Sequence, residues 1–240
     1  MPSSNKHIAI YLNNTDRSAF SDRFENDGEK TATLLRQIRP NWRYQIFDCV
    51  MGEFASDPSV FDGVILTGSV ASVNDETPWI EQLLQQIPLM IEAKTPLIGL
   101  CFGHQAIAKV LGGTVGRGKV WEFGASTTNI ANRKPWMVPA VDELTLYCGN
   151  NEQVQKLPEK MELLGGNSIC PNALTVVGNH VMTTQYHPEM SDVFIKALIE
   201  EYAETLGTEV AENARATIVN GAGGETFAKW MVNFLEMDRA

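Results

Sequence analysis

The residues with the clearest chemical potential lie in the stretch "PLIGLCFGHQAIAKVLGG", Pro96 to Gly113. A short apolar run leads into Cys101, which Gly99 and Gly103 flank in the pattern G-x-C-x-G. In the corresponding serine motif, the nucleophile sits on a strained turn between a strand and a helix. Glycines on both sides remove the Cβ clashes that would oppose so sharp a turn. The pattern makes Cys101 a candidate nucleophile, although a cysteine buried for packing would look the same.

A helix that begins directly after Cys101 would also stabilise negative charge at its N-terminus. Its first residue would be Phe102, whose backbone N–H could donate to an oxyanion. The partial positive charge at a helix N-terminus favours a thiolate, which is the nucleophilic form of cysteine. Two consecutive residues therefore predict a nucleophile and one oxyanion donor.

A cysteine nucleophile needs a base and a group that orients the base. Among the four histidines, His187 in "TTQYHPEMSDVF" fits best, because the following proline favours an extended backbone there and Glu189 lies within reach of the imidazole. Taken alone, "HPE" is more typical of a surface turn, and it indicates a catalytic loop only in combination with G-x-C-x-G. We expect His104 to be a packing or supporting group, and His7 and His180 to be structural or solvated.

A second oxyanion donor should come from another loop at the end of a strand. The stretch "ILTGSVASV" has this form, because an apolar run ends at Gly68 and Ser69. Backbone amides of such a loop can face a ligand at the carboxyl edge of a parallel sheet. An ordinary turn between a strand and a helix is the alternative.

The composition is that of an acidic globular protein. The chain has 240 residues, of which 44% are hydrophobic and 20% charged, and its formal net charge is -10. A surface of this sign repels polyanions, so we expect no nucleic-acid partner. The apolar run Ile8 to Leu12 near the N-terminus is too short for a signal-peptide core or a membrane span.

The four cysteines are widely spaced and include no C-x-x-C pair. A disulfide scaffold is therefore not expected, and no zinc ligand set is visible. We expect free thiols in a reducing cytoplasm, with no metal and no cofactor.

Short apolar runs alternate with helical patterns in the first half of the chain. Such an order predicts an α/β fold with a mostly parallel sheet and helices on both faces. Thr77 and Pro78 mark a helix start, and Pro88 predicts an interruption of that helix. The expected strands cover residues 7–13, 43–49, 61–69 and 96–100, and the expected helices cover 18–38, 77–93 and 103–111.

After Gly113 the pattern changes to β-rich segments separated by Gly, Asn and Pro, which predicts an antiparallel extension or hairpins. Two helices should close the chain, and residues 207–223 should hold a short helix and a flexible loop. We see no linker, so residues 1–240 are expected to form a single domain. The β-rich segments are 114–130, 143–148, 161–165, 173–177 and 181–186, and the closing helices are 190–206 and 224–237.

Three motifs together resemble the class I (triad-type) glutamine amidotransferases. "GLCFGHQ" is similar to the nucleophile elbow of that family, "QYHPE" to its His-Pro-Glu loop, and "LTGSVASV" lies in the place of its oxyanion loop. The order of the motifs also fits. The resemblance covers about residues 6–190, and "FAKWMVNFL" at 227–235 resembles a helix that often ends such domains.

The resemblance implies a flavodoxin-like fold and hydrolysis of the γ-amide of glutamine through a γ-glutamyl thioester. Cys101 would attack the amide carbon, His187 would protonate the leaving ammonia and then activate water, and Glu189 would orient His187. The amides of Ser69 and Phe102 would hold the oxyanion, with Gly68 shaping the loop.

The resemblance also implies a substrate-binding position at Gln105, but other positions depart from the family pattern. Gly68-Ser69-Val70 stands where the family usually has Gly-Gly-Pro. Gly149 and Asn150 stand where many members have a Ser-His pair for the amino-acid end of glutamine, so Asn150 is a candidate substrate ligand. Glu152 occupies the place of a later acidic residue.

The partner and the substrate stay open at this point. No synthetase segment and no phosphate-binding G-x-x-x-x-G-K-[ST] pattern is visible. Either a separate synthetase subunit receives the ammonia, or the protein acts alone, as do related γ-glutamyl peptide hydrolases with a similar "TGS…SV…D…PWI" pattern. A non-catalytic binding or sensory protein is the third alternative, against which the complete set of Cys101, His187 and Glu189 counts. The oligomeric state is not indicated.

Overall fold

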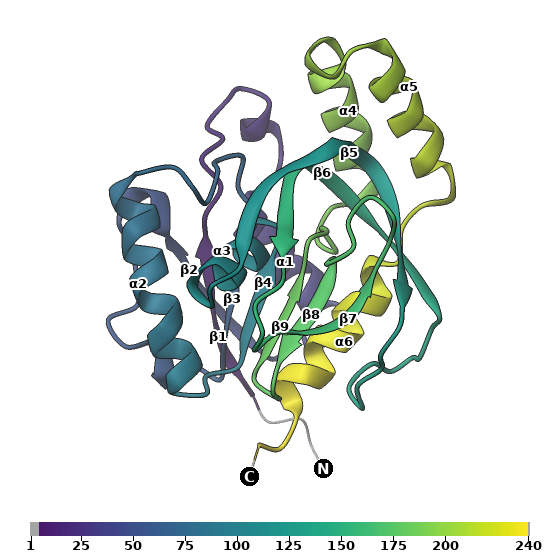
Figure 1. Ribbon diagram of the computed structural model, residues 1–240. Helices are drawn as coiled ribbons and strands as arrows, with labels where there is room; N and C mark the ends of the chain where they lie inside the picture. The colour runs from purple at the N-terminus through teal and green to yellow at the C-terminus, as the bar shows by residue number, and fades with distance from the viewer. Residues whose placement is uncertain (1–4, 240) are drawn as a thin grey trace.

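The computed structural model describes residues 5–239, which form a nine-stranded sheet with helices packed against it (Figure 1). The strand order is β2-β1-β3-β4-β9-β8-β7-β5-β6, and the first five of these strands run parallel. The other neighbouring pairs are antiparallel. The strands are β1 His7–Leu12, β2 Arg43–Asp48, β3 Gly63–Leu66, β4 Leu97–Leu100, β5 Thr114–Ile130, β6 Glu143–Lys156, β7 Glu162–Gly166, β8 Leu174–Val177 and β9 Val181–Thr184.

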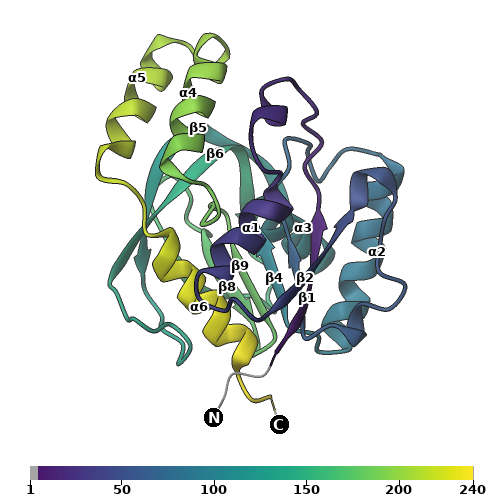
Figure 2. The same ribbon diagram turned by 180° about the vertical axis from the view of Figure 1, so that it is seen from behind.

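Helices cover both faces of the parallel part of the sheet, as the sequence predicts. The α-helices are α1 Asp27–Arg36, α2 Pro78–Glu92, α3 Phe102–Val110, α4 Asp192–Leu206, α5 Thr208–Thr217 and α6 Gly224–Glu236. Helices α1 and α6 lie over one face, which Figure 2 shows toward the viewer, and α2 and α3 lie over the other. None of these helices combines the length and the hydropathy that a membrane span requires.

The central strands bury side chains on both faces. In β1, Ile8 and Ile10 join the core under α1 and α6, while Ala9 and Tyr11 join the core under α2 and α3. This alternation follows from the two-residue period of a strand. A strand with two covered faces reads as a continuous apolar run, which is why residues 7–13 are recognisable in the sequence.

Helix α1 is much shorter than the helix predicted over residues 18–38. It begins at Asp27, because Asn26 and Glu29 form a capping box that satisfies the first amides of the helix. The preceding residues form a loop with a single 3-10 turn at Ser21–Arg23. The aromatic residues before Asn26 therefore belong to a loop at the carboxyl edge of the sheet and not to a helix face.

Helix α2 continues through Pro88, so the predicted interruption is wrong. Pro88 lies on the exposed side of the helix, where water can satisfy the carbonyl group that loses its amide partner. Thr77 occupies the N-cap position and Pro78 the first helical position, as predicted. The Thr77 hydroxyl, however, makes no capping hydrogen bond.

Strand β9 corrects the expected chain path. Residues 181–186 are predicted to belong to the antiparallel extension. Strand β9 ends at Thr184 and pairs in antiparallel with β8, as predicted, but its other edge pairs in parallel with β4. The backbone N–H of Cys101 donates to the Thr184 carbonyl at 2.9 Å. The segment that follows β9 therefore starts beside the cysteine.

The antiparallel part is larger than expected and carries its own helices. Strand β6 runs to Lys156, well beyond the predicted residues 143–148. Helices α4 and α5 pack on β5 and β6 through a separate apolar cluster that includes Phe123, Tyr147 and Ile199. In Figure 1 this pair of helices stands above the sheet. The helix expected within residues 207–223 is α5, followed by a 3-10 turn at Ile218–Asn220.

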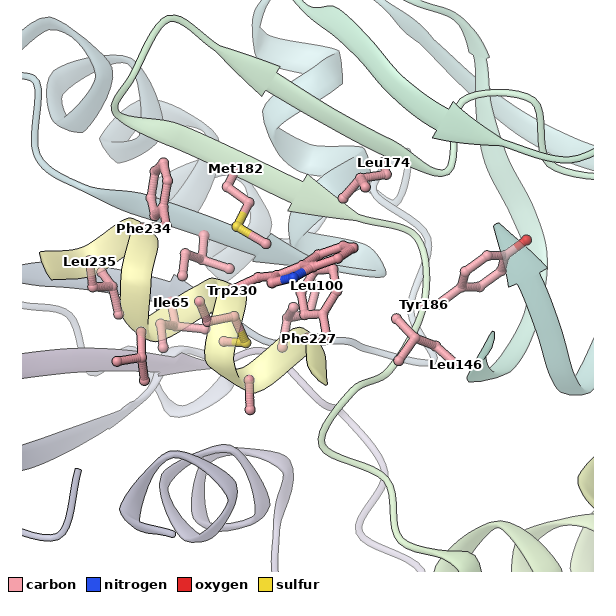
Figure 3. Packing of buried hydrophobic residues seen from close by; sticks show 14 of the residues in the cluster. Ile65, Leu100, Leu146, Leu174, Met182, Tyr186, Phe227, Trp230, Phe234 and Leu235 are labelled. Carbon is pink, nitrogen blue, oxygen red and sulfur yellow. The ribbon is translucent and has the colours of Figure 1, made fainter. Parts of the chain in front are cut away.

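Helix α6 supports the strand that carries the cysteine. Trp230 is fully buried and belongs to the same apolar cluster as Leu100, the last residue of β4. Figure 3 shows its indole near Leu100 and Phe227, between the helix and the strands. The indole N–H donates to the Pro139 carbonyl at 2.8 Å, so this buried polar group is satisfied.

We predict that Trp230→Ala lowers the free energy of unfolding by about 3–5 kcal/mol, because it leaves a cavity against β4 and an unpaired carbonyl. Denaturant unfolding followed by circular dichroism would measure this. The control is Lys229→Ala on the same helix, where an exposed ion pair with Glu225 is lost and a change within about 0.5 kcal/mol is expected. Equal effects of the two substitutions would contradict the role assigned to Trp230.

Candidate active site

Cys101 lies at the junction of β4 and α3 in a strained backbone conformation. Its φ is 47° and its ψ is -101°, a region that residues with a Cβ rarely adopt. A Cβ on Gly99 would come within 2.7 Å of the Gly103 carbonyl carbon, and a Cβ on Gly103 within 2.6 Å of Leu66. Both glycines are therefore required by close approach at the turn, as the G-x-C-x-G pattern predicts.

His187 and Glu189 lie on the loop that follows β9. His187 Nδ1 and Glu189 Oε1 are 2.7 Å apart, and both residues are buried. The backbone N–H of His187 donates to the Tyr147 carbonyl at 2.9 Å, which fixes this loop against β6. A Cβ built on Gly68 would lie 2.7 Å from His187 Cε1 and 3.6 Å from Cys101 Cβ. The structure thus brings Cys101 and His187 together around a glycine.

The electrostatics of this group favour a charged imidazole. Burial by itself lowers the pKa of His187, but the negative charges of Glu189 and Cys101, and hydrogen bonds to both, raise the pKa well above its ordinary value. Because Nδ1 is bonded to Glu189, the hydrogen bond between His187 and Cys101 involves the other ring nitrogen, Nε2. The arrangement can hold a proton on His187 beside a sulfur nucleophile.

The other cysteines and His104 lie in environments that disfavour charge. Burial raises the pKa of Cys49 and of Cys148 well above the usual range, and raises the pKa of Cys170 to about 12. Burial lowers the pKa of His104 to about 3, and its Nδ1 shares a hydrogen bond with Thr183 Oγ1 at 2.7 Å. His104 is therefore neutral and packed behind the elbow.

Gln185 is a residue at this site that sequence reasoning missed. Its Nε2 donates to Cys101 Sγ at 3.4 Å, and its Oε1 accepts from Gln105 Nε2 at 3.2 Å. Gln105 also donates to the Glu152 carbonyl at 2.9 Å. Gln185 is the first letter of the "QYHPE" motif, so a signal was present, but nothing in the sequence separates this glutamine from a strand residue.

The two predicted oxyanion loops meet at the same place. Phe102 is the first residue of α3, where a backbone amide has no partner within the helix. Ser69 follows Gly68 beyond β3, and Ser69 and Cys101 line the same cavity. Asn13 ties this loop to β1, since its backbone and side-chain amides both bond to Thr67. The assignment of oxyanion donors stays a prediction.

The cavity beside Cys101 has a volume of about 440 Å³, and one of its walls is polar. Gln105, Asn150 and Glu152 lie in that wall. Asn150 exposes 7% of its surface, and its Oδ1 has no hydrogen-bond partner within residues 5–239. Ser72 Oγ donates to Glu152 Oε2 at 2.7 Å and so fixes the carboxylate. This wall can accept or donate hydrogen bonds to a polar ligand.

An irregularity in β5 adds two further residues to the cavity. The pairing of β5 with β6 shifts between Arg117 and Glu122, so residues 118–121 face Asn151 alone. Trp121 lies within this bulge and Arg117 directly before it, and both line the cavity. The sequence predicts only a β-rich segment there, because a bulge of this kind depends on the partner strand.

The side chains around Cys101 bond to one another and do not form a candidate metal site. Throughout the described part of the chain, no group of three His, Cys, Asp or Glu side chains is arranged to hold a metal ion. His187 is instead paired with Glu189, and Gln185 with Gln105.

Comparisons with known proteins match this chain to one family model and to several named proteins. Residues 42–194, more than half of the chain, match the family model described as glutamine amidotransferase class-I. Similar proteins include γ-glutamyl peptidase 5 of Arabidopsis thaliana, 25% identical with 92% of this chain and 91% of the relative covered. A subunit of the glutamine-hydrolysing GMP synthase of Methanocaldococcus jannaschii is 29% identical over 54% of this chain and 65% of the relative.

Solved structures agree at the level of the fold. A crystal structure of a glutamine amidotransferase from Thermotoga maritima superposes with a TM-score of 0.76 at 21% identity, covering 96% of both chains. At this identity the likeness concerns the chain path alone. It supports the predicted flavodoxin-like arrangement.

We predict that His187 keeps its proton to a higher pH than an ordinary histidine and that Glu189→Gln lowers its pKa, because the neutral amide removes the nearby negative charge. Side-chain NMR of isotope-labelled histidines as a function of pH would measure both. His180 is the internal control, since burial lowers its pKa and Glu189 is not among the causes. An unchanged titration of His187 in the variant would contradict the pairing.

We also predict that Gly68→Ala slows alkylation of Cys101 by iodoacetamide at neutral pH on the order of tenfold, because the new methyl group displaces the imidazole from the sulfur. Peptide mapping by mass spectrometry would follow the modification. Gly116→Ala is the matched control, since the three atoms nearest to its Cβ all belong to the flexible side chain of Gln155. An equal rate in the two variants would show that Gly68 does not position His187.

Proposed function

Because the chain belongs to the class-I glutamine amidotransferase family, we propose that Cys101, His187 and Glu189 form a catalytic triad that hydrolyses a γ-glutamyl amide bond. One observation carries the proposal. A buried His187–Glu189 pair with a raised imidazole pKa lies against a cysteine on a strained turn. Backbone strain is costly, and both such strain and a shifted pKa are typical of functional sites.

The first half of the reaction forms a thioester. The Cys101 thiolate adds to the γ-carbonyl carbon, and the oxygen takes up the negative charge beside the amides of Phe102 and Ser69. When this intermediate collapses, the C–N bond breaks and the leaving nitrogen takes the proton from His187 Nε2. Ammonia or an amine departs, and Cys101 carries the γ-glutamyl group.

The second half releases glutamate. Neutral His187 takes a proton from water, whose oxygen adds to the thioester carbon. Collapse breaks the C–S bond, which returns Cys101 to the thiolate, and the new carboxyl group loses its proton to solvent. His187 is again charged and Glu189 again pairs with it. Atoms and charges balance without a cofactor.

The polar wall of the cavity is suited to the amino-acid end of the substrate. The Glu152 carboxylate can receive the α-ammonium group, and Arg117 can receive the α-carboxylate. Asn150 offers its unpartnered Oδ1 in the same wall. These assignments, together with Gln105 as a holder of Glu152, make a site for a γ-glutamyl group in place of the expected Ser-His pair.

Two versions of this activity are supported by different relatives. The Methanocaldococcus relative is named as part of a GMP synthase, which supports delivery of ammonia from glutamine to a separate synthetase. The Arabidopsis relative is named a γ-glutamyl peptidase and is matched over nearly its whole length, which supports a hydrolase that acts alone. The complete triad argues against a purely binding or sensory role.

We predict that Cys101→Ala lowers hydrolysis of every γ-glutamyl substrate roughly 10⁴-fold or more, to the uncatalysed background. The assay incubates the protein with glutamine and with γ-glutamyl peptides and measures ammonia and free amine. The control is Cys49→Ala, because Cys49 is buried away from the cavity. Circular dichroism would verify that both variants fold.

The outcome separates the versions. Hydrolysis of glutamine but not of the peptides favours the amidotransferase. Hydrolysis of the peptides but not of glutamine favours the standalone hydrolase. Trapping of the acyl group by hydroxylamine in the wild type, but not in Cys101→Ala, would identify the thioester. Retained activity in Cys101→Ala would refute the triad.

A further inference from the structure

One helix of the antiparallel part presents an apolar ridge to the cavity. Met190, Phe194, Leu198 and Tyr202 all line the cavity and follow one another at intervals of four residues. This spacing places the last three on a single face of α4. Across from the end of this ridge, the ring of Phe123 lies 6.1 Å from that of Tyr202. The cavity therefore has an apolar end as well as a polar one.

The apolar end belongs to the side from which the leaving group departs. His187 donates its proton to the leaving nitrogen in the proposed mechanism. The leaving nitrogen must therefore lie on the His187 side of Cys101. Met190 directly follows Glu189 in the chain, and α4 begins two residues later. The polar wall, with Gln105 and Glu152, lies on α3 and β6 instead. The γ-glutamyl group and the leaving amine thus have separate walls.

The charged groups at the apolar end are mainly acidic. Asp27 is neutralised, because it accepts from Lys30 Nζ at 2.9 Å, and the same ammonium lies 3.4 Å from the centre of the Phe194 ring. Asp16 also lines the cavity, and no Lys or Arg among residues 5–239 forms an ion pair with it. Its charge acts on Tyr202, whose pKa is raised by burial first and then by Asp16.

We propose that this end of the cavity binds the leaving amine and selects one with an apolar body and without a carboxylate. The proposal rests on the proposed function and adds the class of substrate. An alkyl or aromatic body gains free energy by covering the ridge of α4, whereas ammonia leaves that surface in contact with water. A carboxylate would instead be brought close to Asp16 in a partly desolvated space, where like charges repel strongly.

The size of the cavity agrees with this substrate class. Its volume of about 440 Å³ lies in the range of pockets that enclose drug-sized ligands. Val70 and Trp121, both exposed and both lining the cavity, extend its apolar surface. Ammonia is too small and too polar to cover the apolar surface of these side chains.

A matched set of substrates tests the proposal. The set contains γ-glutamyl-n-butylamide, γ-glutamyl-4-aminobutyrate and glutamine, so that the first two share an alkyl stem and differ in a carboxylate. We expect the wild type to hydrolyse the butylamide with a kcat/KM about tenfold above each of the others. Equal or faster hydrolysis of the aminobutyrate substrate would overturn the proposal.

Asp16→Asn isolates the effect of charge. The asparagine can keep the hydrogen bond that Asp16 accepts from the backbone of Ser18, so the loop is retained. We expect the ratio of butylamide to aminobutyrate turnover to fall about threefold, chiefly through a lower KM for the aminobutyrate substrate. Asp57→Asn is the control, because Asp57 makes the same kind of turn with Ser59 but lies outside the cavity. An unchanged ratio in Asp16→Asn would overturn the role of charge.

Failure of this proposal is distinguishable from failure of the proposed function. Cys101-dependent hydrolysis of glutamine or of the aminobutyrate substrate, with the butylamide inert, would refute the leaving-group preference and leave the triad intact. Absence of hydrolysis and of acyl trapping with all three substrates would refute the function itself, and the preference with it.

Discussion

The backbone of Cys101 is the constraint on which the rest of the site depends. A residue with a Cβ at positive φ costs on the order of 1–3 kcal/mol, and this cost is offset only where the surroundings hold the conformation in place. Here β4 fixes the chain before the cysteine, α3 fixes it afterwards, and Thr184 of β9 accepts the cysteine N–H. Gly99 and Gly103 make room for the turn. The same geometry that strains the backbone projects the sulfur into the cavity and places the Phe102 amide next to it.

The parallel pairing of β4 with β9 is the second feature on which the site depends. Because both strands end at the same edge of the sheet, the residues that follow them meet there, and His187 reaches Cys101 although 86 positions separate them in the chain. Tyr147 of β6 then fixes the backbone of His187 through the antiparallel part of the sheet. The antiparallel extension is thus more than an addition to the fold, because it positions the histidine loop and supplies Glu152 of the polar wall and the ridge of α4.

Much of this arrangement can be predicted from the sequence, and the remainder depends on tertiary contacts. Cys101 and His187 are recognisable because a strained turn and an extended loop require particular residues at fixed offsets. The shorter α1 could have been found from the Asn26–Glu29 capping box. Gln185 and the ridge of α4 are different, since a buried glutamine and an apolar helix face have the same sequence pattern whether they line a core or a cavity. The parallel pairing of β9 with β4 is equally hidden, because the second strand of a hairpin carries no sign of which strand lies at its other edge.

In the proposed mechanism, the raised pKa of His187 suits the kind of bond that is cleaved. An amide nitrogen is a poor leaving group until it is protonated, so the enzyme needs an acid that still holds its proton at neutral pH. An ordinary imidazole would be mostly neutral there, whereas the buried charges of Glu189 and Cys101 keep His187 protonated. Once the thiolate has become a thioester, its charge no longer supports the imidazolium, and the pKa of His187 must fall. In the proposed mechanism the same residue is therefore an acid when the amine leaves and a base when water arrives, and consumption of the thiolate converts one role into the other.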